Sequence, residues 1–230
     1  MRPVVTSFLT GNWPHLPGTG SKDLGSRYAT VLAATLARFA PQADFVLWTD
    51  RTADELPGID CRPIPALPGW FGSIYQFAPE AFPEGTRILS MDLDTAVIGD
   101  LTPFLEVPLD KLVGIGDTGN AVRGQLCNGI MSWEAGPRYW PIWNNFKHNV
   151  GRPPPFDSPV GRITTDEAWL RWHVKSAWVS WAKLLPRMSR SYKNEVLRGN
   201  KTVDDGARII YFHGNPRPHT VAESWNPHRT

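Results

Sequence analysis

The chain has 230 residues, with 24 Lys and Arg against 22 Asp and Glu and a formal net charge of +2 at pH 7. These charges are spread along the sequence, so no basic surface of the kind that binds nucleic acid or an anionic membrane is predicted. A composition that is 41% hydrophobic and 20% charged excludes disordered and fibrous proteins and predicts one globular domain with a full core.

Targeting segments and disulfides are not expected. No apolar stretch approaches the roughly 18 residues that a membrane span needs, and the apolar run at the start is too short for a signal peptide. We therefore expect a cytoplasmic protein without a membrane span. Cys61 and Cys127 fit no Cys-x-x-Cys pattern, so buried free thiols are favoured over a single disulfide.

The first part of the chain alternates strand patterns with a helix pattern. Residues 3–9 predict a strand that runs into a Gly/Pro-rich loop over 10–22. Apolar residues over 23–39 keep an i, i+3, i+4 rhythm and predict an amphipathic helix. A short strand over 44–50 and an extended segment over 60–67 follow. This alternation predicts an α/β fold with a Rossmann-like, mostly parallel central sheet flanked by helices.

The second part continues the alternation. Strands are predicted over 111–117, 127–133 and 207–214, helices over 137–150 and 164–174, and a proline-rich loop over 151–162. Four tryptophans recur at roughly helical spacing, which favours core packing over ligand binding: Trp169, Trp172, Trp178 and Trp181. The literal G-x-G-x-x-G at 114–119 opens no helix pattern, so it is interpreted as a loop and not as a dinucleotide site.

Two aspartates, two positions apart, lie inside the largely apolar segment "RILSMDLDTAVIGDL" at residues 87–101, where its part "ILSM" ends. In a strand, side chains two positions apart share a face, so Asp92 and Asp94 should project together, about 6 to 7 Å apart along the backbone. Burying unpaired carboxylates is costly, and two such oxygen ligands at the carboxyl edge of a sheet suit Mg²⁺ or Mn²⁺. The alternatives are two solvated aspartates, or the strand-terminal Asp-x-Asp of a haloacid-dehalogenase phosphatase.

The same strand closely resembles the Asp-x-Asp strand of GT-A fold glycosyltransferases of family 8, which includes galactosyl- and glucosyltransferases and glycogenin. Further similar segments follow in the family's order: "CNGIMSWEAG", "TTDEAWL", "SYK" and "IIYFHGNPRPH". They extend the resemblance over residues 87–219. It implies one GT-A domain over 1–230, with a nucleotide-binding part at about 1–100, an acceptor-side part at about 101–219 and a C-terminal tail over 220–230.

The resemblance also implies roles for individual residues. Asp92 and Asp94 would hold Mn²⁺ or Mg²⁺ against the diphosphate of a nucleotide sugar, most simply a UDP-sugar. The other donor-binding residues that it implies are Asn128, Gly129, Asp166, Lys193, Gly214 and Arg217. Of these, Asn128, Gly129 and Asp166 would contact the sugar, and Gly214 and Arg217 would approach the phosphates. Asp166 would also be catalytic, together with Glu167.

Several positions depart from the family pattern or leave alternatives open. The family's third metal ligand is a histidine, and its register places Tyr211 here, whereas His213 precedes Gly214 directly. His213 could replace that ligand or be structural. Glu167 stands where the family has Gln, and could act as a nucleophile or cap the helix. Asp50, at a predicted strand end, could meet the base or sit in a turn. The segment "GWFGSIYQF" lacks the basic residue common in relatives.

The predicted function is metal-dependent transfer of a hexose from a nucleotide sugar, with retention. The acceptor would be a saccharide, a lipid-linked glycan or a protein, docking at 139–146 and 151–162. A nucleotide-sugar-binding protein without catalysis is the alternative, since Glu167 and the missing basic residue could mark lost function.

Overall fold

The computed structural model describes residues 1–11, 24–67, 69–116, 125–152, 154–158, 161–200, 202–203 and 206–229. The helices are α1 (Leu24–Phe39), α2 (Gly72–Tyr75), α3 (Thr102–Glu106), α4 (Trp140–Asn144), α5 (Asp166–Val174) and α6 (Trp181–Leu184). The strands are β1 (Val4–Leu9), β2 (Asp44–Thr49), β3 (Asp60–Pro63), β4 (Arg87–Met91), β5 (Ala96–Val97), β6 (Leu112–Gly116), β7 (Leu126–Glu134), β8 (Phe156–Ser158), β9 (Gly161–Ile163), β10 (Trp178–Ser180), β11 (Ser189–Ser191) and β12 (Ile209–Tyr211).

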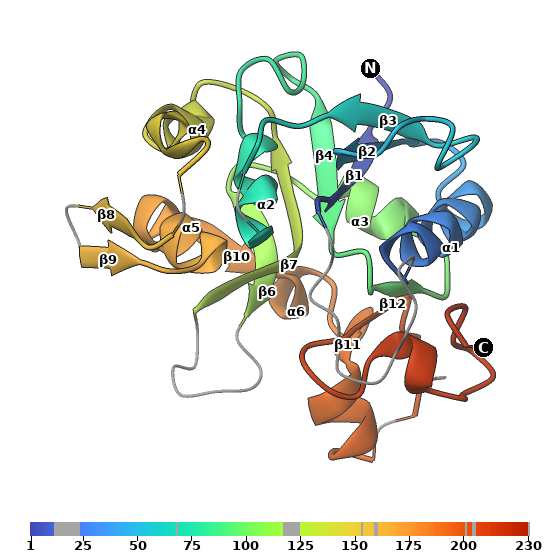
Figure 1. Cartoon of the computed structure of the whole chain (residues 1–230). Coiled ribbons are helices and arrows are strands. Elements are labelled where there is room, and N and C mark those ends of the chain that lie inside the picture. The colour runs from blue at the N-terminus through green and yellow to red at the C-terminus, as the bar shows by residue number, and fades with distance from the viewer. Residues whose placement is uncertain are drawn as a thin grey trace.

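A seven-stranded sheet, in the order β10-β6-β7-β4-β1-β2-β3, forms the centre of the molecule (Figure 1). β1 runs parallel to β2 and β4, β2 to β3, and β10 to β6, whereas β7 is antiparallel to both β4 and β6. The sheet is therefore mixed but mostly parallel, and the predicted fold class is confirmed. β4 is the middle strand of the seven, which places the residues after Met91 near the centre of one sheet edge.

Alternating side chains of the central strands build a separate core on each face. Ile88, Leu112 and Met131 join one buried cluster, which α2, α4 and α5 cover. Their neighbours in sequence, Leu89, Val113 and Ile130, belong to the cluster on the opposite face of the sheet. The helices α1, α3 and α6 cover this second cluster. This period of two is what extended backbone dictates, and a strand apolar at every position must be covered on both faces.

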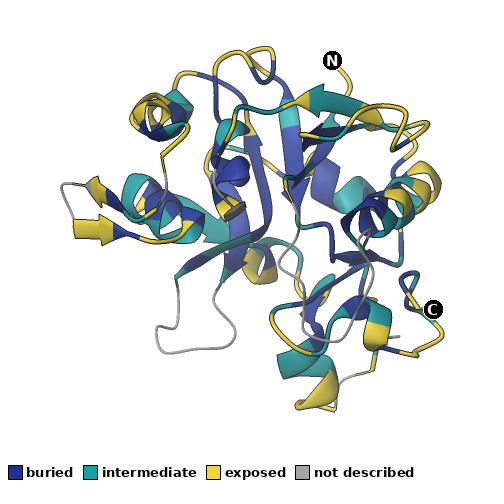
Figure 2. Ribbon diagram, in the orientation of Figure 1, coloured by how far each residue is buried: buried dark blue, intermediate teal, exposed yellow. Residues whose placement is uncertain are grey.

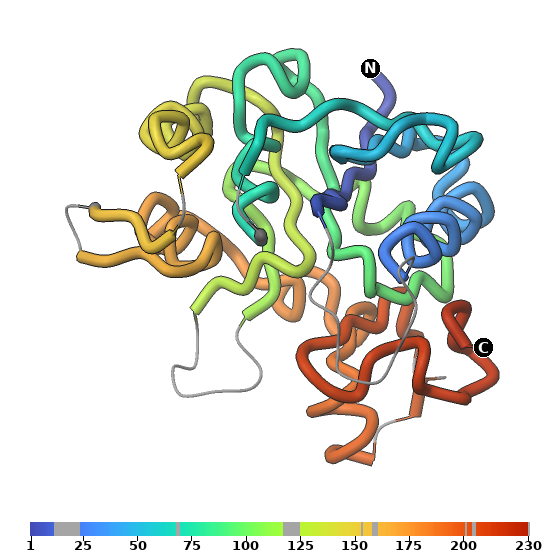
Figure 3. Tube along the Cα trace, viewed as in Figure 1, coloured from blue at the N-terminus to red at the C-terminus, as the bar shows by residue number. Residues whose placement is uncertain are grey.

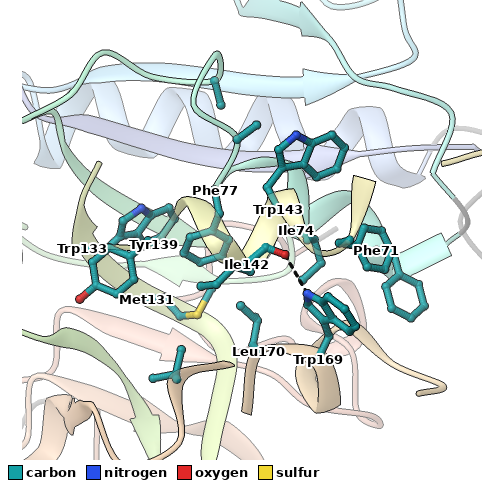
Figure 4. Packing of buried hydrophobic residues seen from close by; sticks show 14 of the residues in the cluster. Phe71, Ile74, Phe77, Met131, Trp133, Tyr139, Ile142, Trp143, Trp169 and Leu170 are labelled. Carbon is teal, nitrogen blue, oxygen red and sulfur yellow. Dashed lines mark hydrogen bonds between the residues drawn. The ribbon is translucent and has the colours of Figure 1, made fainter. Parts of the chain in front are cut away.

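Aromatic side chains dominate the core on the α5 side (Figure 4). Phe77 stacks on Trp133 at 4.5 Å between ring centroids, and Phe71 stacks on Phe146 at 5.2 Å. The Trp169 indole N–H donates a hydrogen bond to the Ile142 carbonyl at 2.9 Å. This bond joins α5 to α4, so the first turn of α5 is held by a rigid aromatic cluster.

The C-terminal segment forms a second structural unit against α1. β11 pairs in parallel with β12, which pairs antiparallel with β5, so the small sheet joins the C-terminal residues to the segment that follows the Asp-x-Asp motif. The tail from Pro218 to Arg229 continues beside α1 (Figure 3). Val221, Asn226 and His228 are buried within it (Figure 2). The tail is therefore packed structure and not a loose extension.

Several sequence expectations are confirmed and others corrected. Core packing of the tryptophans is confirmed, but their spacing spans α5, β10 and α6 and does not follow one helix. Both cysteines are free and partly buried, so the disulfide alternative is wrong. The segment over 151–162 contains the antiparallel pair β8–β9 and is not only a loop. Within the described residues, no helix has the length and apolar composition that crossing a membrane requires.

Candidate active site

The Asp-x-Asp motif lies in a turn directly after β4. The Thr95 N–H donates to the Asp92 carbonyl at 3.0 Å and closes the turn, while the Asp92 N–H donates to the Gly129 carbonyl of β7 at 2.9 Å. Leu93 between the aspartates is buried. The expected position at the carboxyl edge of the sheet is confirmed, whereas the expected strand geometry is wrong, because the chain turns at Asp92 to reach β5.

Both aspartates line a cavity of about 240 Å³ at this edge. Its other lining residues are Phe8, Trp70, Leu93, Asn128, Thr165, Asp166, Glu167, Phe212, His213 and Arg217. They come from the ends of β1, β4, β7 and β12, from the 3₁₀ turn Gly69–Phe71 and from the start of α5. Among the described lining residues, four carboxylates therefore share the cavity with one guanidinium, that of Arg217, and such a concentration of negative charge favours a cationic or metal-bridged ligand.

Asp92 forms no ion pair with any described residue. Burial, followed by the charges of Asp94 and Asp166, raises its pKa well above the ordinary range. No hydrogen bond or ion pair from the described part of the chain reaches its side chain. Gly129 makes room for it, since a Cβ at that position would lie 3.2 Å from Asp92 Oδ2. A buried, unpartnered carboxylate facing a cavity is the arrangement that a bound cation would stabilise.

Asp94 already has a cationic partner. The Arg217 guanidinium lies 2.6 Å from Asp94 Oδ2. Burial raises the pKa of Asp94, and the Arg217 charge and hydrogen bond oppose that rise. Arg217 joins the end of the chain to the motif, and it occupies the carboxylate that a cation would also use.

Asp166 is fixed by three donors. Its Oδ2 accepts from Ser73 Oγ at 2.5 Å and from Asn128 Nδ2 at 2.7 Å, and its Oδ1 accepts from the Glu167 N–H at 2.8 Å. Burial nevertheless raises the pKa of Asp166 to about 6. The structure thus brings two predicted residues, Asn128 and Asp166, into direct contact, and adds Ser73, whose role no sequence pattern indicated.

Glu167 follows in the first turn of α5 and also lines the cavity. It forms an ion pair with Arg171 one turn later at 3.0 Å, and Arg171 Nε donates to the Leu126 carbonyl at 2.7 Å. Thr165 caps the helix, since its side chain accepts from the Ala168 N–H at 3.2 Å. The cap is therefore Thr165 and not Glu167, whose side chain lines the cavity instead.

His213 and Tyr211 lie in different surroundings. His213 lines the cavity, and its Nε2 lies 2.7 Å from Ser191 Oγ. Tyr211 ends β12 and belongs to the buried core on the α1 side. Within the described ranges, no three His, Cys, Asp or Glu side chains converge closely enough to hold a metal ion by themselves. A cation bound to Asp92 and Asp94 would thus need ligands from its substrate or from water.

The remaining predicted residues lie around this cavity or outside its lining. Lys193 Nζ lies 3.7 Å from the position of a Cβ at Gly214, which has a positive φ of +67°. Asp50 does not line the cavity, and its Oδ2 accepts from the Gly11 N–H at 2.6 Å. In the G-x-G-x-x-G sequence, Gly114 and Gly116 lie in β6, while 117–119 and most of the loop over 10–22 fall outside the described residues.

Comparison with known proteins identifies the fold. No protein-family model matches the chain, and no curated protein matches it. The glycosyltransferase GlyE of Streptococcus pneumoniae TIGR4 matches with a TM-score of 0.61 at 15% identity, over 95% of this chain but 56% of that one. The galactosyltransferase LgtC, solved with donor and acceptor sugar analogs, matches with a TM-score of 0.59 at 13% identity, over 94% of this chain and 88% of that one.

A third match is the bifunctional glycosyltransferase WbbM, with a TM-score of 0.58 at 13% identity, over 94% of this chain and 46% of that one. The chain therefore spans less than two thirds of GlyE and of WbbM, and most of LgtC. At these identities the likeness shows the GT-A type fold, and the phosphatase alternative loses its structural basis. Membership of family 8 stays a prediction.

Proposed function

We propose that the protein is a metal-dependent glycosyltransferase that moves a hexose from a nucleotide sugar, most simply a UDP-sugar, to an acceptor with retention. The observation that carries the proposal is the Asp92–Asp94 turn after the central strand, which directs two carboxylates into a cavity that also holds Asp166, Glu167 and Arg217. Ligands of open α/β sheets bind at this edge, and the fold is one that glycosyltransferases use.

The cation would be Mn²⁺ or Mg²⁺, held by Asp92 and Asp94. The donor set fits because both ligands are hard oxygens and because the Asp92 carboxylate has no other partner in the described part of the chain. When bound, the cation would offset the negative charge that develops on the diphosphate leaving group. Arg217 would then turn from Asp94 to the phosphates, where a guanidinium donates two hydrogen bonds at once. Lys193 and Gly214 would lie beside them.

The sugar would lie against Asn128, Gly129 and Asp166. The three hydrogen bonds that fix Asp166 leave it oriented towards the cavity, where a sugar hydroxyl can replace the amide of Asn128 as a donor. Glu167, held by Arg171, would act as the nucleophile at the anomeric carbon in a retaining reaction. Trp70 lines the same cavity with 43% of its surface exposed, and exposed indole rings suit the apolar faces of sugars.

The acceptor would dock beside α4 and the β8–β9 pair, as the sequence predicts for 139–146 and 151–162. Both segments pack near α5, whose first turn carries Asp166 and Glu167 (Figure 1). Asp50, whose Oδ2 accepts from the Gly11 N–H, would border the base of the nucleotide.

A catalytically inactive nucleotide-sugar-binding protein is the second candidate. It rests on the two departures from the family pattern, Glu167 in place of Gln and the missing basic residue in "GWFGSIYQF", which would mark lost catalysis. Such a protein would bind UDP in the presence of Mn²⁺ but would not release UDP from any UDP-sugar.

The test is release of free UDP from a panel of UDP-sugars, with Mn²⁺ and with excess chelator, beside a UDP-binding titration of the same sample. We expect chelator-sensitive release from one donor. Binding without release from any donor, even with simple saccharide acceptors, would support the inactive protein. Release that persists in chelator would contradict the metal-dependent mechanism.

A further inference from the structure

A second cavity, of about 800 Å³, lies where α1, β5, the segment before β12 and the C-terminal tail meet. It shares no lining residue with the candidate active site. Three arginines line it, each from a different segment: Arg38 from the last turn of α1, Arg208 from the approach to β12, and Arg229 from the tail. We define these three as the arginine groove.

The described residues do not balance the charges of the arginine groove. Among the described lining residues there is no Asp or Glu, and none of the three guanidinium groups forms an ion pair in the described part of the chain. The Asp100 carboxylate accepts hydrogen bonds from the Thr102 N–H and hydroxyl, which lower its pKa. The Arg208 charge adds to this effect, but the two side chains form no ion pair. Three cations without an ion-pair partner among the described residues, arranged around one concave surface, create a positive potential that attracts anions.

The groove is also held in shape. Arg208 packs so closely on Gly99 that a Cβ there would clash with its side chain, and its Nη1 donates to the Ala207 carbonyl at 3.3 Å. The Arg38 guanidinium lies 4.8 Å from the Phe39 ring centroid. Arg27 Nη2 donates to the carbonyl oxygens of His228 and Arg229 at 3.1 and 3.3 Å. These contacts reduce the ordering that a ligand would require.

We propose that the arginine groove binds a small organic molecule that carries phosphate groups. Guanidinium forks match phosphate oxygens in geometry and in charge. Val97, Ile98 and Trp225 give the same cavity an apolar wall, and its volume leaves room for an organic group beyond the phosphates. The proposal does not depend on glycosyl transfer, because the two cavities have separate linings.

Inorganic pyrophosphate is the probe, titrated calorimetrically into the full chain with excess chelator so that no metal contributes. We expect one saturable site, and a loss of affinity of at least about tenfold in the triple variant Arg38→Gln, Arg208→Gln, Arg229→Gln. The matched control is Lys111→Gln, Lys183→Gln, Arg198→Gln, which removes equal charge at exposed positions elsewhere and should bind normally.

Three results would overturn the proposal. The first is no pyrophosphate binding by the wild type, and the second is equal loss in the triple variant and its charge control. The third is that the protein binds phosphatidylglycerol vesicles but not pyrophosphate, and that the triple variant loses the vesicle binding. This result would assign the groove to lipid headgroups.

Asp204 and Asp205 lie outside the described residues, and the double variant Asp204→Asn, Asp205→Asn should leave pyrophosphate binding intact or strengthen it. If the triple variant does not fold, Arg38→Gln and Arg229→Gln singly replace it.

Discussion

Arg217 competes with the cation in the proposed metal site, because its guanidinium forms an ion pair with the Asp94 carboxylate at 2.6 Å. In Arg217→Gln that carboxylate loses its partner, so Mn²⁺ alone should bind about tenfold more tightly, while UDP in the presence of Mn²⁺ should bind about tenfold more weakly. Calorimetry with the metal and then with the nucleotide measures both. Parallel losses of metal and UDP affinity would show that Arg217 does not compete with the cation.

Gly129 is predicted to support the proposed metal site, because its lack of a side chain leaves room for the Asp92 carboxylate. A methyl group there would press on Asp92 Oδ2 from 3.2 Å, so Gly129→Ala should displace the carboxylate and lower the affinity for Mn²⁺ with UDP by roughly tenfold, or about 1.4 kcal/mol. Gly136→Ala is the control, since its Cβ would make only ordinary contact, 3.7 Å from Glu84 Cγ. Equal metal affinities in the two variants would contradict this role.

Asp166 gives a prediction for pH. Its folded-state pKa of about 6 exceeds the ordinary 3.8, so the native state binds more protons than the unfolded state between these values. The Asp166 contribution to stability is therefore present below about pH 4 and is lost as pH rises to about 6, a change of about 1 to 3 kcal/mol. Chemical unfolding of wild type and Asp166→Asn in chelator should show a difference that changes over this range and is flat above it. A constant difference would refute the shift.

Residues that carry chemistry in a local motif could be predicted from the sequence, and their partners could not. Asp92, Asp94, Asn128 and Asp166 stand in segments whose order along the chain is informative, and all line the cavity. Ser73 reaches Asp166 from 93 residues away. Only the packing of α2 against α5 brings the two together, and no spacing in the sequence encodes it.

At the scale of elements, periodic patterns predicted β1, α1, β2, β6, β7 and α5 close to their observed bounds. The pattern could not distinguish a strand that continues through Asp92 from one that ends at Met91, since apolar residues follow on both sides of the turn. Short elements held by distant partners were also missed. β5 pairs with β12 from more than 100 residues away, and the π-helical turn Tyr192–Leu197 has no sequence signal of its own.

The C-terminal tail packs against the Asp-x-Asp turn. His228 is 1% exposed, and its Nε2 lies 3.0 Å from the carbonyl oxygen of Thr95, the residue after Asp94. His228→Ala should lower the free energy of unfolding by about 1 to 3 kcal/mol and weaken Mn²⁺-dependent UDP binding. His148→Ala, at an exposed position, is the control. Denaturant unfolding that does not distinguish the two variants would show that the tail does not support the turn.

At the scale of the whole molecule, the cavity lies where the central sheet, α5 and the C-terminal segment meet. No one of them supplies a complete set of ligands: β4 leads to the aspartates, α5 brings Asp166 and Glu167, and the segment after β12 brings His213 and Arg217. The α/β class followed from the alternation of strand and helix patterns. The antiparallel β7 and the small second sheet depend on long-range pairing, which local periodicity does not specify.

The most direct test of this account is a titration of Mn²⁺ followed by electron paramagnetic resonance, which detects free Mn²⁺, for wild type and for Asp92→Asn in the presence and absence of UDP. We predict that the wild-type protein binds one equivalent of Mn²⁺ in the presence of UDP and much less in its absence. A folded Asp92→Asn variant with UDP should lower the free Mn²⁺ by no more than the same concentration of UDP does without protein. Equal Mn²⁺ uptake by wild type and Asp92→Asn would contradict the central claim that the Asp92–Asp94 turn is a metal and nucleotide site.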